Sequence, residues 1–521
     1  MRNIIKISIL SITISVLSLS CDSFLDELPD NRTVVDSSEK VAKLLVSAYP
    51  ESYYTLVSEL SSDNIDDYGA SNPNTSVFYE QIAYWKESSE VDNDDLKSVW
   101  EACYKAISNA NEALKAIKEL GSPATLNPQK GEALLARAYN HFVLVNLFSN
   151  HYNTQTSGSD LGITYMTMPE TTLSPKYERG TVAEVYQKIN TDLEEGLPLI
   201  DDTLYEVPKY HFNRRAAYSF AARFNLYYEN WQKAADYATI ALGASPASVL
   251  RNWAALGALP RTGSVVSNSY IQAEHNANFL LLTDASNMGY VFGAYYTGSR
   301  FSHVKDIANR ETLLAAGPWG ATTINRYRFI PFEYSATNLD KYLYYKIPFM
   351  FQYTDLVAQI GYRRTVYSVF SADETLLIRA EANILLKKYA EAVSDLNLWA
   401  RNFYTFTNNI PQADIEAFYA NLPYSTADNP TQKKVLRPKF TIEAGTQENL
   451  LHYALQCRRI LTIHEGFRWF DIRRYGIEVL RYQHHLDGSK TVEDILTTND
   501  LRRTFQIPQD VILAGLTPNP R

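Results

Sequence analysis

Apolar residues recur every three or four positions along much of the chain, which is the spacing of helices that bury one face. The pattern is clear in residues 98–120 and again in residues 129–148. The first stretch places the following residues on one stripe: Val99, Cys103, Ala106, Ile107, Ala110, Leu114 and Ile117. Both stretches are therefore predicted to be long amphipathic helices.

Two short motifs predict where later helices begin. Thr181 is followed three residues later by Glu184, and Ser371 by Glu374. A hydroxyl and a carboxylate at this spacing can each accept a hydrogen bond from a free backbone N–H of the first helical turn, which is the arrangement called a capping box. Helices are expected directly after Thr181 and after Ser371.

Two segments align without gaps as copies of one helical hairpin. Residues 220–238 read FAARFNLYYENWQKAADYA, and residues 378–396 read IRAEANILLKKYAEAVSDL. The alignment pairs residues of like size: Ala222 with Ala380, Trp231 with Tyr389, and Ala234 with Ala392. Small residues let two helices approach closely, and an aromatic ring at the turn packs between them, as in tetratricopeptide repeats. The copies are scattered rather than tandem, so the repeat is degenerate.

The helical pattern weakens between residues 244 and 370. A quarter of the residues from 290 to 353 are aromatic, against 13% of the whole chain, and Gly and Pro interrupt the stretch. Residues 402–446 form a second polar, Pro-containing interruption. The predicted fold is therefore mostly α: degenerate tetratricopeptide-like helical hairpins form a frame, mainly in 38–243 and 371–475, and loop-rich insertions occupy 244–370 and 402–446. We expect residues 21–521 to be a single domain.

The first twenty residues have the pattern of a secretory signal. Arg2 and Lys6 precede an apolar stretch, residues 7–19, that is too short to span a bilayer. The stretch ends in LSLSC, which resembles a bacterial lipobox, although Ser18 stands where that motif usually has Leu. Cleavage before Cys21 would make it the lipid-modified amino terminus, and several acyl chains give stable anchoring. The alternative is an ordinary signal with an incidental cysteine.

Charge and composition exclude some classes of partner and cofactor. The net charge of −9 becomes −11 once the two basic residues of the signal are removed, and phosphate binding requires a basic face, so no nucleic acid is expected. With three cysteines there is no disulfide framework and no zinc ligand set, and we expect Cys103 and Cys457 to be buried. No calcium or phosphate-binding loop motif is visible, so no cofactor and no metal are predicted. The 37 Tyr suit a contact surface.

Residues 464–474, HEGFRWFDIRR, combine an imidazole, two carboxylates and three guanidiniums. A zinc protease motif needs a second His four residues after His464, where this chain has Arg468. A glycosidase pair of Glu465 and Asp471 lacks a general acid, because the neighbouring arginines hold both carboxylates ionised. A Cys457–His464 nucleophile has no orienting third group in the sequence.

A structural role explains the segment better. A helix from Leu450 is expected to end near Gly466, and Trp469 and Phe470 to be buried after it. The arginines can then bind nearby acids or carbonyl groups: Arg468, Arg473 and Arg474 with Glu465, Asp471 or free backbone oxygens. We therefore predict no catalytic residue in this segment.

Together with residues 373–382, DETLLIRAEA, this segment resembles the SusD/RagB family of surface nutrient-binding lipoproteins. Their carboxyl-terminal signature runs roughly ERR-x-EL-x-x-EG-x-RWFDL-x-R, and Cys457 and Leu461 stand here in place of its glutamates. The chain keeps these residues of it: Arg458, Arg459, Glu465, Gly466, Arg468, Trp469, Phe470, Asp471 and Arg474. The resemblance extends over nearly the whole chain, through FLDELP after the lipobox, the helix with Trp100 and Tyr104, and the helix with Arg137.

The resemblance implies a mostly helical protein with four tetratricopeptide-like pairs on one side and a variable ligand-binding region on the other. Members act as a lid on a SusC-type TonB-dependent transporter in the outer membrane, face the cell exterior, and capture oligosaccharides or in some cases peptides. They are not enzymes. A less favoured alternative is a secreted glycoside hydrolase with its site in the aromatic insertion, but the acids there, Asp306, Glu311 and Glu333, form no motif.

Two regions carry the residue types that bind sugars. Aromatic faces pack on the C–H patches of a sugar ring, while amides and charged groups bind its hydroxyls. Residues 61–85 offer Tyr68, Asn72, Tyr84 and Trp85, and residues 290–328 offer Tyr295, Tyr296, Trp319, Asn325, Arg326 and Tyr327. The predicted ligand-binding residues are Tyr68, Trp85, Tyr295, Tyr296, Trp319 and Arg326. The alternative for each aromatic residue is that it covers the frame.

Overall fold

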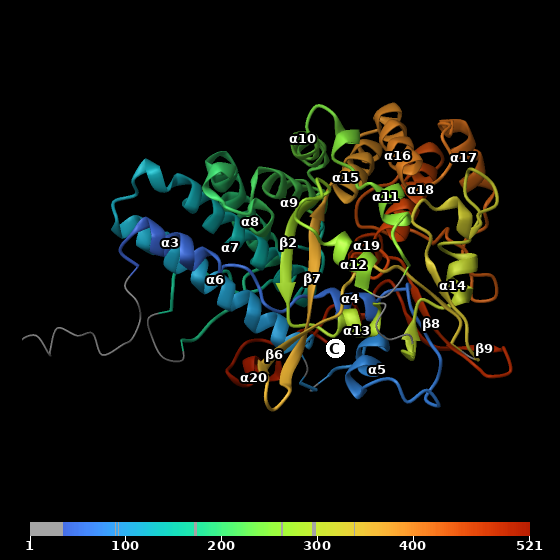
Figure 1. Ribbon diagram of the computed structural model, residues 1–521, viewed down its shortest axis with the longest axis horizontal. Coiled ribbons are helices and arrows are strands. Elements are labelled where there is room, and N and C mark those ends of the chain that lie inside the picture. The colour runs from blue at the N-terminus through green and yellow to red at the C-terminus, as the bar shows by residue number, and fades with distance from the viewer. Residues whose placement is uncertain are drawn as a thin grey trace, which may run out of the picture.

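The computed structural model describes residues 35–88, 90–91, 93–170, 175–261, 264–293, 298–337 and 339–521. Of the residues predicted from the sequence, Cys21 and the signal before it, Tyr295 and Tyr296 lie outside these ranges. Helices dominate the molecule, and the long strands β2 (Asn278–Asp284) and β7 (Ile360–Ser371) run between two groups of them (Figure 1). This confirms the mostly helical class.

The amino-terminal helices are α3 (Ser38–Leu45), α6 (Leu96–Glu119), α7 (Asn127–Phe148) and α8 (Val182–Gly196). The predicted stripe of α6 is buried from Val99 to Ile117, with Leu114 only half-buried. Cys103 lies within that stripe, and it is buried as expected. At the start of α8 both hydrogen bonds of the Thr181–Glu184 capping box are present. Packing and capping therefore place these helices where the sequence predicts them.

The two aligned segments form matching helical hairpins, α9 (Arg214–Tyr227) with α10 (Trp231–Leu242), and α15 (Ala372–Leu385) with α16 (Tyr389–Phe403). Their turns have the same geometry: Glu229 has a φ of 59° and Lys387, the aligned residue, a φ of 61°. The next N–H in each turn donates to an aligned carbonyl, Asn230 to Asn225 and Lys388 to Asn383, both at 2.8 Å. The two hairpins therefore have the same backbone conformation at their turns.

The second predicted capping box is only half formed. The Ser371 hydroxyl accepts from the Glu374 N–H at 3.3 Å. The Glu374 carboxylate does not return to Ser371 but accepts two hydrogen bonds of 3.1 Å from the buried Arg223 guanidinium. A charged partner in the interior outcompetes the backbone N–H, and the resulting pair joins α9 to α15.

The carboxyl-terminal helices are α17 (Gln412–Asn421), α18 (Thr446–Leu461) and α19 (Arg468–Arg474). The helix expected to end near Gly466 ends five residues earlier, at Leu461. A second helix starts at Arg468, within residues 464–474, which we call the signature segment. The shorter helices are α4 (Thr55–Ser61), α5 (Val77–Ala83), α11 (Trp253–Gly257), α12 (Ser264–Tyr270), α13 (Met288–Val291), α14 (Lys305–Arg310) and α20 (Gln509–Leu513).

The region expected to be loop-rich, 244–370, holds most of the strands. Besides β2 and β7 it contains β3 (Phe301–Ser302), β4 (Phe332–Tyr334), β5 (Lys341–Leu343) and β6 (Met350–Asp355). The other strands are β1 (Asp66–Asp67), β8 (Val479–His484) and β9 (Lys490–Leu496). They form sheets of order β3-β1-β8-β9, β2-β7-β6 and β4-β5. β2 is buried on both faces, so it shows a continuous apolar run instead of the alternation that marks a half-exposed strand.

Tyrosine contributes to the interior more than the composition suggested. About half of the 37 Tyr are buried, and their hydroxyls bind interior partners such as the Glu132 carboxylate, which accepts from Tyr49 at 2.7 Å. Among the described residues, no helix has the length and apolarity needed to cross a bilayer.

Candidate functional site

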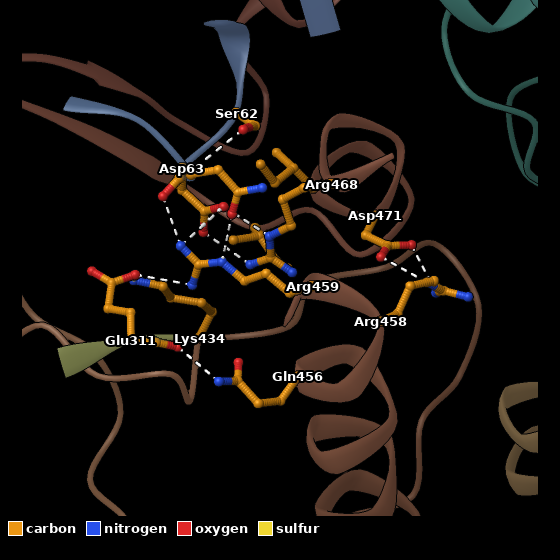
Figure 2. Close-up of polar contacts among 12 residues, drawn as sticks. Ser62, Asp63, Glu311, Lys434, Gln456, Arg458, Arg459, Arg468 and Asp471 are labelled. Atoms are coloured by element: carbon orange, nitrogen blue, oxygen red, sulfur yellow. Dashed lines mark hydrogen bonds and ion pairs between the residues drawn. The ribbon is translucent and has the colours of Figure 1, made fainter. Parts of the chain in front are cut away.

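The signature segment lies in the interior and is held by ion pairs (Figure 2). Arg458, on α18, donates to both oxygens of Asp471, on α19, at 2.9 and 2.7 Å. Arg474 donates at 2.8 Å to Glu381 of α15, which also accepts from the Tyr475 hydroxyl at 2.6 Å. These contacts join three helices, so they position the frame.

A second set of contacts joins α18 and α19 to the segment around Asp63. Arg468 donates to both Asp63 oxygens at 2.8 and 2.9 Å. The expected partners of Arg468 were Glu465 and Asp471, and Asp63 replaces them because the chain after α4 packs against α19. Arg459 binds the Asp63 carbonyl at 2.6 Å and the Glu311 carboxylate at 3.0 Å (Figure 2).

The guanidiniums keep these buried acids ionised. Burial alone raises the pKa of Glu381, but Arg458 and Arg474 outweigh it and hold that pKa at about 2. Burial likewise raises the pKa of Asp63, and Arg459 and Arg468 more than reverse the effect. A carboxyl group in this state cannot serve as a general acid near neutral pH.

Gly466 explains why the segment needs glycine at its turn. Its φ is +75°, and a Cβ there would lie 2.9 Å from the Thr55 carbonyl oxygen of α4. Its N–H donates to the buried Glu59 carboxylate at 3.1 Å, as the His464 N–H does at 2.8 Å. The turn is therefore clamped on α4, and Trp469 and Phe470 beside it are buried as predicted.

The catalytic alternatives find no support in this geometry. Burial raises the pKa of the Cys457 thiol, which disfavours a thiolate nucleophile, and His464 is fully buried. The three insertion acids considered for a hydrolase site are ion-paired: Asp306 with Lys490 at 2.6 Å, Glu311 with Lys434 at 2.8 Å, and Glu333 with Lys305 at 3.0 Å. In the part of the chain that the structure describes, no three His, Cys, Asp or Glu side chains are grouped to hold a metal ion.

Two of the predicted ligand-binding residues, Tyr68 and Trp85, are buried. The Tyr68 hydroxyl donates to the Asp340 carbonyl. The Trp85 indole N–H donates to the Ser61 carbonyl at 2.9 Å, and the guanidinium of Arg481 lies 5.1 Å from the centre of its ring. Neither ring presents a free face to a ligand in this structure. Both side chains lie beneath the surface and are held by hydrogen bonds to backbone carbonyls.

The structure brings the two predicted regions together at one place. β1 pairs antiparallel with β3, which puts Asp67 opposite Phe301 although more than 200 residues separate them. Arg300 fixes the junction, since it binds both Asp67 oxygens at 2.6 and 2.7 Å and Glu80 of α5 at 2.6 Å. Asn72 donates to the Gly298 carbonyl at 3.1 Å.

We group five side chains of these regions and of β7 under the name junction face: Asn72, Asn74, Tyr79, Tyr290 and Arg363. All five side chains are half-buried or exposed. The Arg363 guanidinium lies 3.8 Å from the ring centre of Tyr290 and donates to Asn287 at 2.9 Å. The face thus combines aromatic rings, amides and a guanidinium, which are the groups that bind sugars.

Trp319 and Arg326 lie on a different part of the insertion. Gly317 and Gly320 exchange backbone hydrogen bonds of 2.9 and 2.8 Å, and this turn presents Trp319 half-buried. The indole ring packs on Tyr404 with 4.6 Å between ring centres, and its N–H donates to Thr322 at 2.8 Å. Arg326 is partly exposed and donates to the Ala321 carbonyl at 2.9 Å. Neighbouring Tyr327 is buried, so the turn offers part of one indole face and one guanidinium.

A groove that sequence reasoning did not identify lies between α6, residues 161–170 with 175–179, and α20. Its volume is about 1120 Å³, and its lining includes Trp100, Tyr104, Met166, Met168, Tyr177 and Val511. Arg179 connects its walls, donating at 2.6 Å to the Gly162 carbonyl and at 2.9 Å to the Thr517 carbonyl. Met168, which is exposed, and Met166 and Tyr177, which are half-buried, were a signal for it in the sequence.

One family model matches part of the chain, and solved structures share its fold. Residues 23–226 match a SusD-like family described as starch-binding and associating with the outer membrane. A SusD superfamily protein from Bacteroides vulgatus has 21% identity and a TM-score of 0.65, over 94% of this chain and 99% of the other. One from Bacteroides thetaiotaomicron has 20% identity and a TM-score of 0.63, over 94% and 100%.

A third solved structure, a SusD-like carbohydrate-binding protein from Bacteroides vulgatus, has 17% identity and a TM-score of 0.59, over 92% of this chain and 96% of the other. Comparison with curated proteins finds no match. At these identities the solved structures establish a shared fold.

Proposed function

We propose that the chain belongs to the SusD/RagB family and that it is a surface lipoprotein that captures oligosaccharides and delivers them to a SusC-type TonB-dependent transporter in the outer membrane. The observation that carries the proposal is the match of residues 23–226 to a family described as starch-binding and associating with the outer membrane. The carbohydrate-binding description of a structural relative supports the same ligand class.

We propose two ligand-binding regions: the junction face with Tyr295 and Tyr296 of the same insertion, and separately the turn that carries Trp319 and Arg326. Tyr290 and Trp319 would stack on sugar rings, while Asn72, Asn74 and the guanidiniums would bind hydroxyls. Tyr68 and Trp85 would act by supporting this surface rather than by touching the ligand. A binding role also fits the ion pairs that engage Asp306, Glu311 and Glu333.

A peptide is the second candidate ligand, and the groove beside α6 favours it. Met166, Met168 and Tyr177 provide an adaptable apolar lining, while exposed Lys105 and Glu178 provide charges of both signs. Such a surface suits an extended peptide better than a polar sugar chain.

Direct binding measurements on the chain from residue 22 onward test the proposal. Arrays of plant, host and microbial glycans are screened beside peptide mixtures, and each hit is confirmed by calorimetric titration. We expect a glycan hit that Tyr290→Ala weakens and that Tyr177→Ala, in the groove, leaves unchanged. Binding of peptides alone, weakened only by Tyr177→Ala, would replace the oligosaccharide proposal by the peptide one.

A further inference from the structure

The hairpin of β6 and β7 extends past the rest of its sheet. β2 pairs with residues 365–371 of β7, whereas β6 pairs with residues 360–364. The strands connect through residues 356–359, at the lower edge of the molecule in Figure 1. The end of the hairpin therefore lies beyond the part of β7 that β2 covers.

The end of this hairpin is apolar and exposed. Val357 is 96% exposed, Leu356 71% and Ile360 60%. Phe351 and Tyr353 follow on one side of β6, both exposed, with 4.9 Å between their ring centres. We call these five side chains the hairpin tip. A contiguous apolar group of this kind on a soluble surface marks an interaction site.

The local structure holds the tip out rather than letting it fold back. The Asp355 carboxylate accepts from the N–H groups of Val357 and Ala358 at 2.8 and 2.9 Å, which fixes the turn. Gly361 lets the Phe351 ring lie across β7, because a Cβ there would come within 2.7 Å of that ring. At the base, Arg363 is fixed by its hydrogen bond to Asn287.

The backbone of β6 indicates what kind of partner fits. Among the described residues β6 pairs only with β7, so the other edge of β6 presents backbone groups that no strand pairs with. An extended polypeptide segment can satisfy such an edge by adding a strand, and a sugar chain offers no matching ladder of amides.

The charge pattern argues against a lipid surface as the partner. Segments that lie on membranes carry Lys and Arg around their apolar residues, which bind anionic headgroups. Residues 353–362 contain neither, and their one charged residue is the acidic Asp355. Arg363 and Arg364, which follow, are half-buried and hydrogen-bonded to Asn287 and Gln352. The apolar side chains of the tip therefore match an apolar pocket on a protein.

We infer that the hairpin tip is a docking element for a partner polypeptide, which adds a strand to the free edge of β6 and encloses Val357 and its neighbours. The identity of that partner as the TonB-dependent transporter rests on the proposed function. The free strand edge and the apolar tip are features of the structure that do not depend on the proposed function.

Photo-crosslinking in the full-length, membrane-anchored protein tests the contact. A photoreactive amino acid is placed at Val357, and at Leu513 of α20, which is 78% exposed, as the matched control. The adducts are identified by peptide sequencing. We expect the Val357 position to crosslink the transporter about tenfold more than the control, as a buried interface position should. Adducts only with lipid or with a second copy of this chain, or no excess over the control, would overturn the inference.

A charge substitution separates this inference from the proposed function. Val357→Asp places a carboxylate in the docked pocket and should abolish co-purification with the transporter, while Leu513→Asp should not. Because Val357 is almost fully exposed, the melting temperature and the glycan affinity of the Val357→Asp variant should match those of the wild type. Equal co-purification of Val357→Asp and wild type would refute the hairpin contact alone, whereas a wild type that binds neither glycan nor transporter would refute the proposed function.

Discussion

At the scale of single residues, the interior of this protein depends on charged side chains that the sequence could identify but not pair. Residue types alone indicated that the arginines of 464–474 would bind carboxylates and carbonyls. Arg473 does donate to the carbonyls of Asn146 and Ser149. The partners Asp63 and Glu381 could not be foreseen, because they lie about 400 and 90 residues away and only the packing of α4 and α15 brings them near.

Removing one of these buried acids should destabilise the fold strongly. Asp471→Ala removes the two hydrogen bonds that the buried Arg458 guanidinium donates to Asp471, so that guanidinium keeps only Glu381 as a carboxylate partner. Loss of one partner of a buried pair costs about 3–5 kcal/mol, so the melting temperature should fall markedly. Glu443→Ala, which breaks an exposed pair with Lys387, is the control and should change stability far less. A stable Asp471→Ala protein that had lost ligand binding would contradict the structural role.

Lys341 should make stability depend on pH. Its ammonium group is buried between the Ser299 carbonyl and the Ser302 hydroxyl, each at 2.8 Å, and burial lowers the pKa of Lys341 to about 7. An unfolded lysine has a pKa of about 10.4. Between these values the unfolded chain binds the extra proton, so stability contributed by this site rises with pH, while below pH 7 the full cost of burying the charge is present.

Replacing Lys341 by Met should remove that dependence. The free energy of unfolding of the wild type should rise relative to Lys341→Met by at most about 1.4 kcal/mol per pH unit between pH 7 and 10. Urea denaturation at pH 7 and pH 9 measures it, and Lys118→Met, on the exposed face of α6, is the control. Parallel profiles of the wild type and Lys341→Met would show that Lys341 keeps an ordinary pKa in the folded protein.

At the scale of elements, the sequence predicted what local chemistry determines. The spacing of apolar residues gave α6 and α7, and the matched alanines and aromatics gave two hairpins whose turns share a left-handed residue at Glu229 and Lys387. The strands of 244–370 were missed because β3 to β6 have only two to six residues each, and because β2 pairs with β7, more than 80 residues further on. β1 and β3 have two residues each, and no pattern in so short a run predicts that they will pair.

Packing against distant parts of the chain also explains why some of the predicted binding residues are buried and others are not. Tyr68 and Trp85 occur in a polar loop, which suggested exposure, but β8 passes alongside that loop and buries both rings. Trp319 in contrast stays half-exposed, because the turn between Gly317 and Gly320 places it at the edge of the Tyr404 cluster.

Trp319→Ala tests whether that turn binds ligand. Loss of an aromatic anchor should weaken glycan affinity by about 1–3 kcal/mol. The loss of stability should be much smaller than for Trp399→Ala, because Trp399 is fully buried and its truncation should cost about 3–5 kcal/mol. Calorimetric titration and thermal melting of both variants compare the two effects. Unchanged affinity with a melting temperature as low as that of Trp399→Ala would assign Trp319 to the core.

At the scale of the whole molecule, the proposed function requires three attachments that act together: ligand to the junction face, transporter to the protein, and protein to the membrane. The helical frame is rigidly cross-linked by its buried ion pairs, and repeat frames of this kind offer extended surfaces to partners. The hairpin tip lies on the same β7 that carries Arg363 of the junction face. A partner docked on the tip would therefore be connected to the ligand surface through one strand.

The membrane attachment can be tested separately through Cys21. Metabolic labelling with a fatty-acid probe should mark the wild type and leave Cys21→Ala unmarked, and equal labelling of both would refute acylation there.

Loss of the anchor should also reduce binding to the transporter. An anchor restricts the protein to the membrane surface and so raises its effective concentration near a membrane partner, and that gain disappears without any change in the docking contacts. Cys21→Ala should therefore co-purify with the transporter less than the wild type does when expression is low, and approach the wild type as expression rises. Val357→Asp should remain deficient at every expression level, because it damages the contact itself.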